Sequence, residues 1–219
     1  MAAIHTYPTG TPAASDYVPY VADPTGSPVM RNTLVSDINA GFSWTQVVDE
    51  PGDALTNWTV ASGTWNSSGS YIECTANGFL RYNTAFETAI SIIEAETMIV
   101  TNTGDRYAEF CLAASASTAK TAQQTARIQR VSSTWNWHVE LGGQTAVTNG
   151  SFSGAEDTWY KMRQVFIGNR AIFYIDDTRY ATYDVAHNIS MDRIGLSVVG
   201  ATIRYRNIKA WTADLGLPA

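Results

Sequence analysis

The strongest constraint on the fold is a period of two in the hydrophobic residues from residue 42 onward, interrupted by frequent turn residues. In the segment WNWHVEL, residues 135–141, every second residue is apolar. One face of it carries Trp135, Trp137, Val139 and Leu141, and the other carries Asn136, His138 and Glu140. No long segment keeps the period of 3.6 that an amphipathic helix requires. The pattern therefore predicts an all-β chain of short antiparallel strands, with the two tryptophans in the core.

The first forty residues differ in composition and pattern from the rest of the chain. Five of the seven prolines fall before residue 30, and proline removes a backbone donor, so no helix is expected there. The segments YVPYVA and VMRNTLVSDI flank the turn sequence DPTG, which predicts a hairpin. We therefore expect an extended arm over residues 1–41 and a sandwich over 42–219. The arm is too small to bury its own apolar side chains and needs a partner surface or copies of itself. The residues expected to make the assembly contacts are Tyr17, Tyr20, Val21, Val29, Arg31, Leu34 and Ile38.

Two adjacent aspartates stand at the end of an apolar run in FIGNRAIFYIDDTRY, residues 166–180. The strands on either side of Gly168-Asn169 have similar lengths, and a two-residue Gly-Asn connection is typical of a hairpin. Asp176 and Asp177 then form the next turn, since aspartate in turns accepts hydrogen bonds from its own backbone. A cation site is the alternative, but calcium requires six or more oxygen ligands and only two carboxylates are local.

Two segments are less regular. ISIIEAETMIV, residues 90–100, is apolar on both faces, which is typical of a strand covered on each side. The alanine-rich stretch around residue 120 has no apolar stripe, so residues 115–124 are predicted to be a polar loop and TARIQRV, residues 125–131, a strand. A short helix in this stretch is the alternative.

Composition excludes several classes of function. A net charge of −6 argues against a groove for nucleic acid, because phosphates would be repelled. The N-terminus has no secretory signal pattern and no apolar run is long enough to span a bilayer, so a soluble protein made in a cytoplasm is expected. Cys74 and Cys111 have no metal-binding spacing; two free thiols are expected, with a disulfide as the alternative.

No catalytic constellation stands out. Glu94 and Glu96 are two residues apart on one strand, a spacing that suits a pair of glycosidase carboxylates. The residue between them is Ala95, however, and no third acid follows. The three histidines are far apart in sequence, and no phosphate-binding glycine loop occurs. We expect no enzyme activity, no metal and no cofactor, with glycoside hydrolysis as the weaker alternative.

LTNWTVASGTWNSSGSYIEC, residues 55–74, resembles the opening of concanavalin A-like lectin/glucanase and laminin-G-like jelly-roll domains. The order of the later segments is also similar: Trp159, Tyr160 and Arg163 in one strand, then YIDD, IGLSVVG and IRYRNIKAW. The resemblance covers about residues 42–214. It implies two antiparallel sheets in a curved sandwich, with the last strand paired near the first.

Members of this fold class bind sugars, so glycan binding is the functional option that the resemblance implies. Sugar sites combine exposed aromatic rings with hydrogen-bonding side chains. The candidate glycan-binding residues are Tyr71, Arg81, Tyr82, Tyr107, Asn136, His138 and Glu140.

The segment SDYVPYVADPTGSPVMRNTLVSDINA, residues 15–40, resembles the N-terminal arm of tailed-phage virion proteins. The resemblance implies a structural virion protein, made in the host cytoplasm and displayed on the particle. A trimeric capsid decoration protein or head fibre is expected, with other virion proteins and a cell-surface glycan as partners. A tail-fibre or tail-tip component, or a soluble carbohydrate-binding module, is the alternative.

Overall fold

The structure is a computed structural model of the chain. It describes residues 17–21, 30–34, 43–86, 90–100, 106–113, 123–141, 148–167, 170–184 and 193–214. The chain divides into two compact units, Thr45–Ala213 and a second made of Met1–Trp44 with Asp214–Ala219. The predicted boundary between residues 41 and 42 lies outside the described residues.

The smaller unit contains a hairpin of β1, Tyr17–Val21, and β2, Met30–Leu34. The strands pair antiparallel, and the register places Tyr17 opposite Leu34. The hairpin predicted from the DPTG turn is therefore confirmed. Five of the expected assembly residues lie in these strands, whereas Val29 and Ile38 lie outside the described residues.

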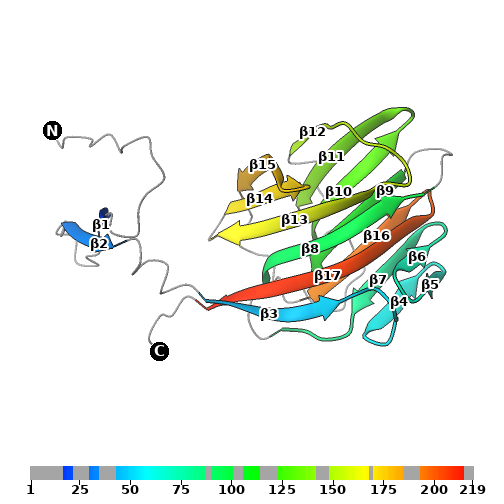
Figure 1. Cartoon of the computed structure of the whole chain (residues 1–219), viewed down its shortest axis with the longest axis horizontal. Coiled ribbons are helices and arrows are strands. Elements are labelled where there is room, and N and C mark those ends of the chain that lie inside the picture. Colours follow the sequence, from blue (N-terminus) through cyan, green and yellow to red (C-terminus); the bar gives the residue numbers. More distant parts are fainter. Residues whose placement is uncertain are drawn as a thin grey trace. The chain divides into compact units, whose positions relative to one another are not determined.

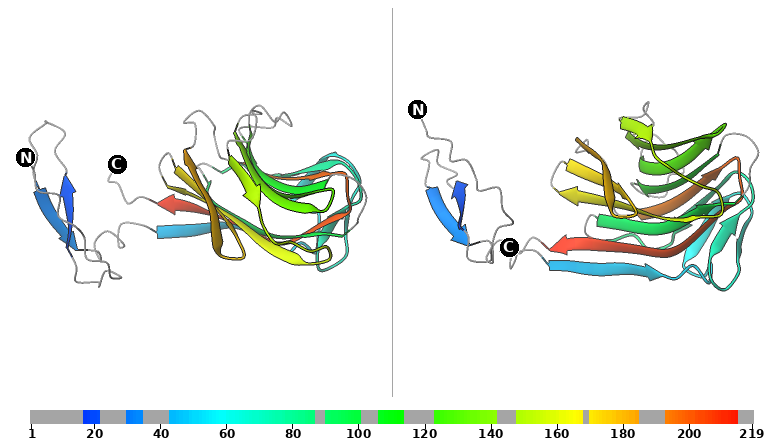
Figure 2. Two further views of the ribbon diagram at one scale, coloured as in Figure 1. Left: turned by 90° about the horizontal axis from the view of Figure 1, so that it is seen from above. Right: turned by 45° about the horizontal axis from the view of Figure 1, so that its top comes forward.

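The larger unit is an antiparallel jelly-roll sandwich of two sheets, as the sequence predicts (Figure 1). Sheet I has the strand order β12-β11-β10-β9-β16-β7-β4, and sheet II has the order β15-β14-β13-β8-β17-β6-β5, with β3 paired to β17. The two sheets form two curved layers in the views of Figure 2.

The strands of sheet I are β4 Trp58–Ser62, β7 Gly78–Tyr82, β9 Arg106–Ala113, β10 Gln123–Val131, β11 Thr134–Leu141, β12 Thr148–Ser151 and β16 Arg193–Val199. Those of sheet II are β3 Ser43–Glu50, β5 Trp65–Ser67, β6 Ile72–Cys74, β8 Ile90–Ile99, β13 Trp159–Ile167, β14 Arg170–Ile175, β15 Thr178–Asp184 and β17 Ile203–Asp214. The last strand, β17, pairs with β3, the first strand of the sandwich, as expected.

The core lies between the sheets and is built from every second residue of the strands. Trp135, Trp137 and Val139 are buried in it, which confirms the alternation predicted for β11. The ring of Trp137 packs 6.3 Å from that of Phe173 on the opposite sheet. Burial of these aromatic and aliphatic side chains is the main stabilising contribution to a sandwich of this kind.

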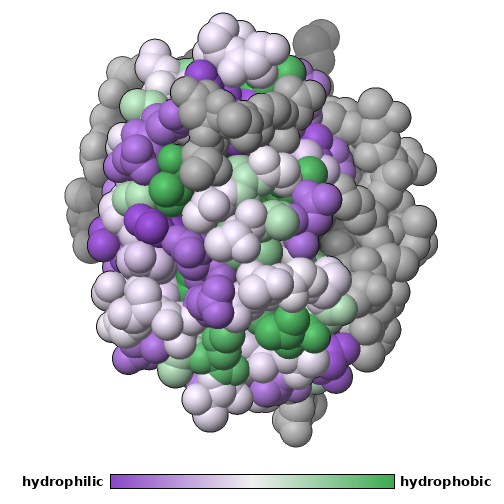
Figure 3. Space-filling model, turned by 90° about the vertical axis from the view of Figure 1, so that its right-hand side faces the viewer, coloured by the Kyte–Doolittle hydropathy of each residue, from purple (hydrophilic) through white to green (hydrophobic). Residues whose placement is uncertain are grey.

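The exterior is mixed in polarity. The large hydrophobic residues that are exposed in the described part of the chain are Trp44 and Val60, at 43% and 45%. On the side that Figure 3 shows, hydrophobic residues form small separate groups among hydrophilic and neutral ones. The described residues include no helix long and apolar enough to cross a membrane.

The segment with the jelly-roll motif crosses from one sheet to the other. β4 belongs to sheet I and β5 to sheet II, and Gly63 stands at the corner with a φ of 81°. A Cβ atom at this position would lie 2.5 Å from the carbonyl oxygen of Asn77. Only glycine adopts this backbone conformation without strain at so close an approach, so Gly63 makes the crossing possible.

The two adjacent aspartates form the predicted turn. Ile175 and Thr178 pair at the ends of β14 and β15, and Asp176 and Asp177 between them have φ angles of 48° and 61°. Two central residues with positive φ define the mirror-image turn that suits a right-twisted hairpin. Residues 168–169 lie outside the described part, but the pairing of Ile167 with Arg170 agrees with the predicted two-residue connection.

Two sequence predictions were wrong in detail. Residues 123 and 124 belong to β10 and not to a loop. The backbone of Gln124 pairs with both β9 and β11, and that of Gln123 pairs with β9. β8 was predicted to be covered on both faces, but Ile92, Glu94 and Glu96 on its outer face are partly exposed. That face is shielded by Arg163 of β13 and Arg206 of β17, which pair with Glu94 and Glu96.

Candidate functional site

The outer face of sheet I, turned away from the core, collects most of the predicted glycan-binding residues. Tyr107 on β9 and Asn136 on β11 are both in register with Gln129 on β10. Arg127 pairs with His138, and Thr125 with Glu140, in the next two rows. Arg81 on β7 pairs with Gly195 on β16, farther along the same sheet. Five of the seven candidates therefore share one surface: Arg81, Tyr107, Asn136, His138 and Glu140.

The centre of this face is a linked set of polar groups. The guanidinium of Arg127 lies 4.5 Å from the centroid of the Tyr107 ring, and its Nη2 is 2.9 Å from Oε1 of Glu140. The amide nitrogen of Gln129 lies 2.7 Å from Nε2 of His138. We call Tyr107, Arg127, Gln129, His138 and Glu140 the sheet I cluster.

The neutral imidazole of His138 is held in one tautomer. The amide nitrogen of Gln129 can only donate, so Nε2 of His138 accepts and the proton resides on Nδ1. Burial, together with the positive charge of Arg127, lowers the pKa of His138 below its ordinary value of 6.5. His138 is therefore neutral at pH 7 and offers a single N–H donor.

Several buried polar atoms of this face lack a partner in the part of the chain that the structure describes, and two of them lie on β10 and β11. These two are Nδ1 of His138 and Oγ1 of Thr125, and both are shielded from solvent. A buried donor or acceptor without a partner costs free energy, so such atoms are expected where a ligand completes the hydrogen bonding.

The residues of β10 were missed by the sequence analysis. Thr125, Arg127 and Gln129 alternate with the buried Ala126 and Ile128. The prediction of a strand over residues 125–131 already contained this alternation. What it lacked was the pairing of β10 between β9 and β11, which brings these side chains beside His138.

Two of the predicted glycan-binding residues lie elsewhere. Tyr82 is on the inner face of β7, where its ring meets that of Trp58 edge-on at 5.0 Å. Its hydroxyl donates to Oε1 of Glu50 at 3.0 Å. Burial, with a further contribution from this hydrogen bond, raises the pKa of Tyr82 to about 12. A ring enclosed in this way has no free face for a sugar, so Tyr82 is a core residue.

Tyr71 lies beside sheet II, next to β6, and not on the sheet I face. The guanidinium of Arg204 lies 4.5 Å from its ring centroid, and the ring of Trp159 lies 6.3 Å away. Tyr71 therefore belongs to a group of stacked aromatic and arginine side chains on the opposite side of the sandwich.

The outer face of sheet II is dominated by ion pairs. Glu94 accepts from Nε of Arg163 at 2.6 Å, and Glu96 accepts from Nε of Arg206 at 2.6 Å and from Asn207 at 2.9 Å. Burial acts in the opposite direction, but the hydrogen bonds from Asn207 and Arg206 lower the pKa of Glu96. Glu96 is thus held as a carboxylate.

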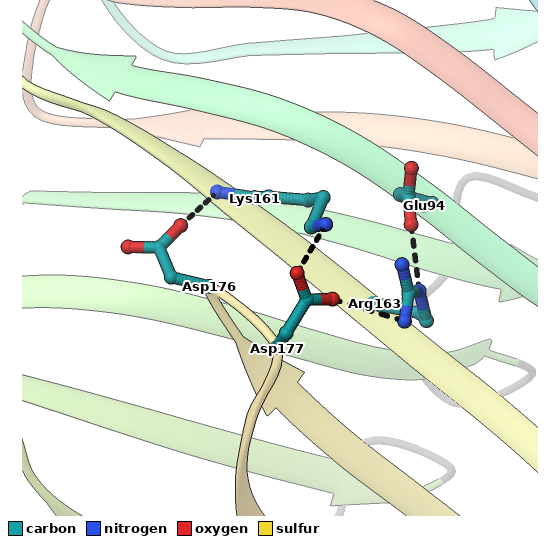
Figure 4. A network of polar contacts seen from close by, with 5 residues as sticks. All are labelled: Glu94, Lys161, Arg163, Asp176 and Asp177. Atoms are coloured by element: carbon teal, nitrogen blue, oxygen red, sulfur yellow. Dashed lines mark hydrogen bonds and ion pairs between the residues drawn. The ribbon is translucent and has the colours of Figure 1, made fainter.

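The turn aspartates join this network, as Figure 4 shows. Oδ1 of Asp176 accepts from the backbone N–H of Lys161 at 2.8 Å. Asp177 accepts from Nζ of Lys161 at 2.6 Å and pairs with Nη1 of Arg163 at 3.1 Å. The side chains of Lys161 and Arg163 thus occupy the carboxylate oxygens of Asp177 that a metal ion would need. No group of three or more potential metal ligands occurs among the described residues.

The thiol of Cys74 is buried in sheet II, and burial raises its pKa. Cys74 is a free thiol in the structure. The side chain of Cys111 is outside what the structure describes, so the expectation that it too is a free thiol stays a prediction.

Comparison with solved structures identifies the architecture. A carbohydrate-binding module, CBM66 from Bacillus subtilis, is similar with a TM-score of 0.58 and 16% identity over 70% of this chain and 94% of its own. A β-glucanase from Bacillus licheniformis is similar with a TM-score of 0.56 and 11% identity, covering 75% of this chain and 97% of its own. The fold is a concanavalin-like jelly roll.

A third concanavalin-like structure is the endo-β-1,3-glucanase from Pyrococcus furiosus, with a TM-score of 0.59 and 10% identity over 78% of this chain and 95% of its own. At these identities the likeness concerns the fold alone. No protein-family model matches the chain, and no curated protein matches it. Proteins of this fold thus include both carbohydrate-binding modules and glucanases.

Proposed function

We propose that the sandwich binds a glycan through the outer face of sheet I. The observation that carries the proposal is the sheet I cluster. It places a neutral imidazole donor, an amide, a carboxylate–guanidinium pair and a tyrosine ring within three neighbouring strands. Sugar hydroxyls donate and accept at once, so they match a surface that offers both kinds of group in fixed positions. The similarity to a carbohydrate-binding module supports this choice.

Binding without cleavage is the favoured form of this function. A glycosidase requires a carboxyl group that stays protonated, with a raised pKa, to donate to the leaving oxygen. Glu94 and Glu96 are the only acids two residues apart in the sequence, and each accepts a hydrogen bond from an arginine. The pKa of Glu96 is lowered, which is the wrong direction for a general acid.

Glycoside hydrolysis is the second candidate, because glucanases share this fold. It predicts release of reducing sugar from a β-glucan by the purified chain, and loss of that activity in Glu94→Gln and Glu96→Gln. Absence of release by the wild type would exclude it. Release that persists in both variants would place a catalytic centre elsewhere on the sandwich.

Glycan binding is tested first on an array with the full chain. The His138→Gln and Asn136→Ala variants are compared with Thr97→Val, a control inside sheet II that leaves the sheet I face unaltered. We expect the wild type and the control to give the same signals and the two sheet I variants to lose them. Equal binding by all four proteins would contradict the proposal.

We propose in addition that the β1–β2 hairpin attaches the sandwich to a tailed-phage particle as a capsid decoration protein or head fibre. A two-stranded hairpin is marginally stable by itself, so a role in which it pairs with other chains suits it. Such pairing adds strands to a neighbouring sheet by backbone hydrogen bonds. The partners would be two further copies of this chain, forming a trimer, and other virion proteins. A tail-fibre or tail-tip position is the alternative.

The attachment role is tested by measuring molar mass by light scattering with and without residues 1–41. We expect a trimer for the full chain and a monomer for the shortened one. A second assay asks whether the shortened protein still joins particles. A monomeric full chain, or normal incorporation without the arm, would contradict this role while leaving glycan binding unaffected.

A further inference from the structure

A hollow of about 330 Å³ lies on the outer face of sheet II, on the opposite side of the sandwich from the sheet I cluster. It is lined by Glu96, Trp159, Lys161, Asp176 and Asp177. Its size falls at the lower end of the range for small-molecule sites. Its lining is polar, because four of the five residues are charged and the fifth, Trp159, is aromatic. We propose that this hollow is a second binding site, for a neutral polyhydroxyl ligand the size of a sugar ring.

The hydrogen-bonding groups of the hollow are held in fixed positions. Asp176 accepts from the backbone of Lys161, and Asp177 is fixed by Lys161 and Arg163 (Figure 4). Both aspartates stand in a tight turn with positive φ, which restricts their backbone as well. Oδ2 of Asp176 accepts no hydrogen bond from the described residues and is exposed, so it is available to a ligand hydroxyl.

The aromatic wall is also fixed. The guanidinium of Arg206 lies 4.0 Å from the centroid of the Trp159 ring, and the ring of Tyr71 lies 6.3 Å away. Trp159 is therefore held half-buried against its neighbours. Its indole N–H has no acceptor in the described part of the chain, and it is not shielded from solvent. The site thus offers one ring edge, one unpaired donor and several carboxylate oxygens.

The charge around the hollow indicates a ligand without net charge. Around the hollow, the carboxylates are Glu73, Glu94, Glu96, Asp176 and Asp177, and the cations are Lys161, Arg163, Arg204 and Arg206; Lys209 pairs with Asp49 farther along the same face. Nearly every charge has an opposite charge within 4 Å. An anion would be repelled by the carboxylate of Asp176, and a cation would gain only a weak, solvent-exposed ion pair with it. Hydroxyl groups can use the remaining lone pairs of the carboxylates without disrupting any pair.

This site goes beyond the proposed function, because it is on the other sheet and shares no residue with the sheet I cluster. A sandwich with a sugar site on each face would bridge two glycan chains. Two linked sites raise the apparent affinity for a multivalent surface well above that of either site alone.

The test follows the indole N–H signal of Trp159 by NMR in the ¹⁵N-labelled full chain, with the signal assigned from Trp159→Phe. The probes are glucose, galactose, mannose, xylose, N-acetylglucosamine and laminaritriose, each titrated to about 50 mM to cover millimolar affinities. We expect a saturable shift with at least one probe. The double variant Asp176→Asn, Asp177→Asn should weaken that binding about tenfold, since asparagine keeps the turn conformation but removes both carboxylates.

His138→Gln separates this site from the sheet I site, and it should leave the Trp159 titration unchanged. Glucosamine carries a positive charge and glucuronate carries a negative charge, on otherwise similar rings. Both should bind no more tightly than glucose. Three results would overturn the inference: no shift with any probe, the same affinity in the double-aspartate variant, or tenfold tighter binding of a charged sugar. Shifts confined to the sheet I residues would overturn it while supporting the proposed function.

Discussion

The outer faces of the two sheets use the same strand alternation but satisfy their polar side chains differently. On sheet II, arginines of β13 and β17 reach across to glutamates of β8 and to Glu73 of β6, and each main pair lies within 2.7 Å. On sheet I, the Arg127–Glu140 pair stands beside buried polar atoms that have no partner in the described chain. The charged side chains on the outer face of sheet II thus largely pair with one another, whereas the outer face of sheet I keeps buried polar atoms without a partner among the described residues.

This difference separates stability from recognition. Removing one member of a closed pair leaves a charge without its partner, so variants of the sheet II pairs should lower stability. Removing a group that has no partner in the free protein should cost little stability, and its effect should appear in binding. The predictions below use this contrast, and they run from the largest expected effect to the smallest.

The largest loss of stability is expected for Arg163→Met. It leaves Glu94, which is mostly buried, without its hydrogen-bond donor, and we expect a loss of about 2 kcal/mol. Urea denaturation of the full chain gives this value. A second substitution, Glu94→Gln, should recover about half of the loss because it removes the stranded charge. Asn136→Ala on sheet I is the matched control, with an expected change below about 0.5 kcal/mol. Equal losses of unfolding free energy in Arg163→Met and Asn136→Ala would contradict the proposed difference between the two faces.

Replacement of Thr125 by valine should stabilise the protein by about 1 kcal/mol, because it removes a buried hydroxyl that has no partner among the described residues. Thr97→Val removes a similar hydroxyl from the interior side of sheet II and should stabilise by about the same amount. Only Thr125→Val should also weaken glycan binding. The two effects are measured by urea denaturation and by titration with the glycan. Unchanged affinity in Thr125→Val would show that its hydroxyl is not a ligand contact.

The smallest effect concerns pH. Because the pKa of His138 is lowered in the folded state, the folded protein disfavours the protonated ring. The stability that the neutral ring contributes is complete above the unfolded pKa of about 6.5 and is lost as the pH falls through the lower folded pKa. The wild type should therefore lose more stability between pH 7.5 and pH 5 than His138→Gln does. Denaturation at the two pH values measures the difference, and parallel losses would contradict it.

Glycan affinity should fall over the same pH interval in the wild type. Protonation of Nε2 removes the acceptor that fixes Gln129, and it places a second positive charge near Arg127. The charged groups facing His138 in the described structure are Arg127 and Glu140. Glu140 offsets the repulsion only in part, because it already pairs with Arg127.

Much of the fold could be predicted from the sequence because the deciding signals are local. The alternation in WNWHVEL identified the buried tryptophans, and the adjacent aspartates identified a turn. The order of the motifs indicated a jelly roll. The partners of each strand could not be predicted in the same way. β9 pairs with β16, at least 80 residues later, and only the complete sandwich determines that pairing.

The candidate site could be predicted in part. Asn136, His138 and Glu140 were identified by period two alone, since they alternate with core residues. The choice of both Arg81 and Tyr82 contradicted that period, because consecutive residues of a strand face opposite sides. The pairing of Arg163 and Arg206 with Glu94 and Glu96 depends on register between strands that are distant in sequence, so the closed character of sheet II could not be predicted.

The central claim is that the outer face of sheet I binds a glycan, and calorimetric titration at pH 7.5 tests it most directly. The ligand is the glycan with the strongest array signal, and the proteins are the wild type, His138→Gln and Thr97→Val. We expect Thr97→Val to bind as the wild type does and His138→Gln to bind about tenfold more weakly, as for loss of a buried hydrogen bond. Identical dissociation constants for all three proteins would contradict the claim.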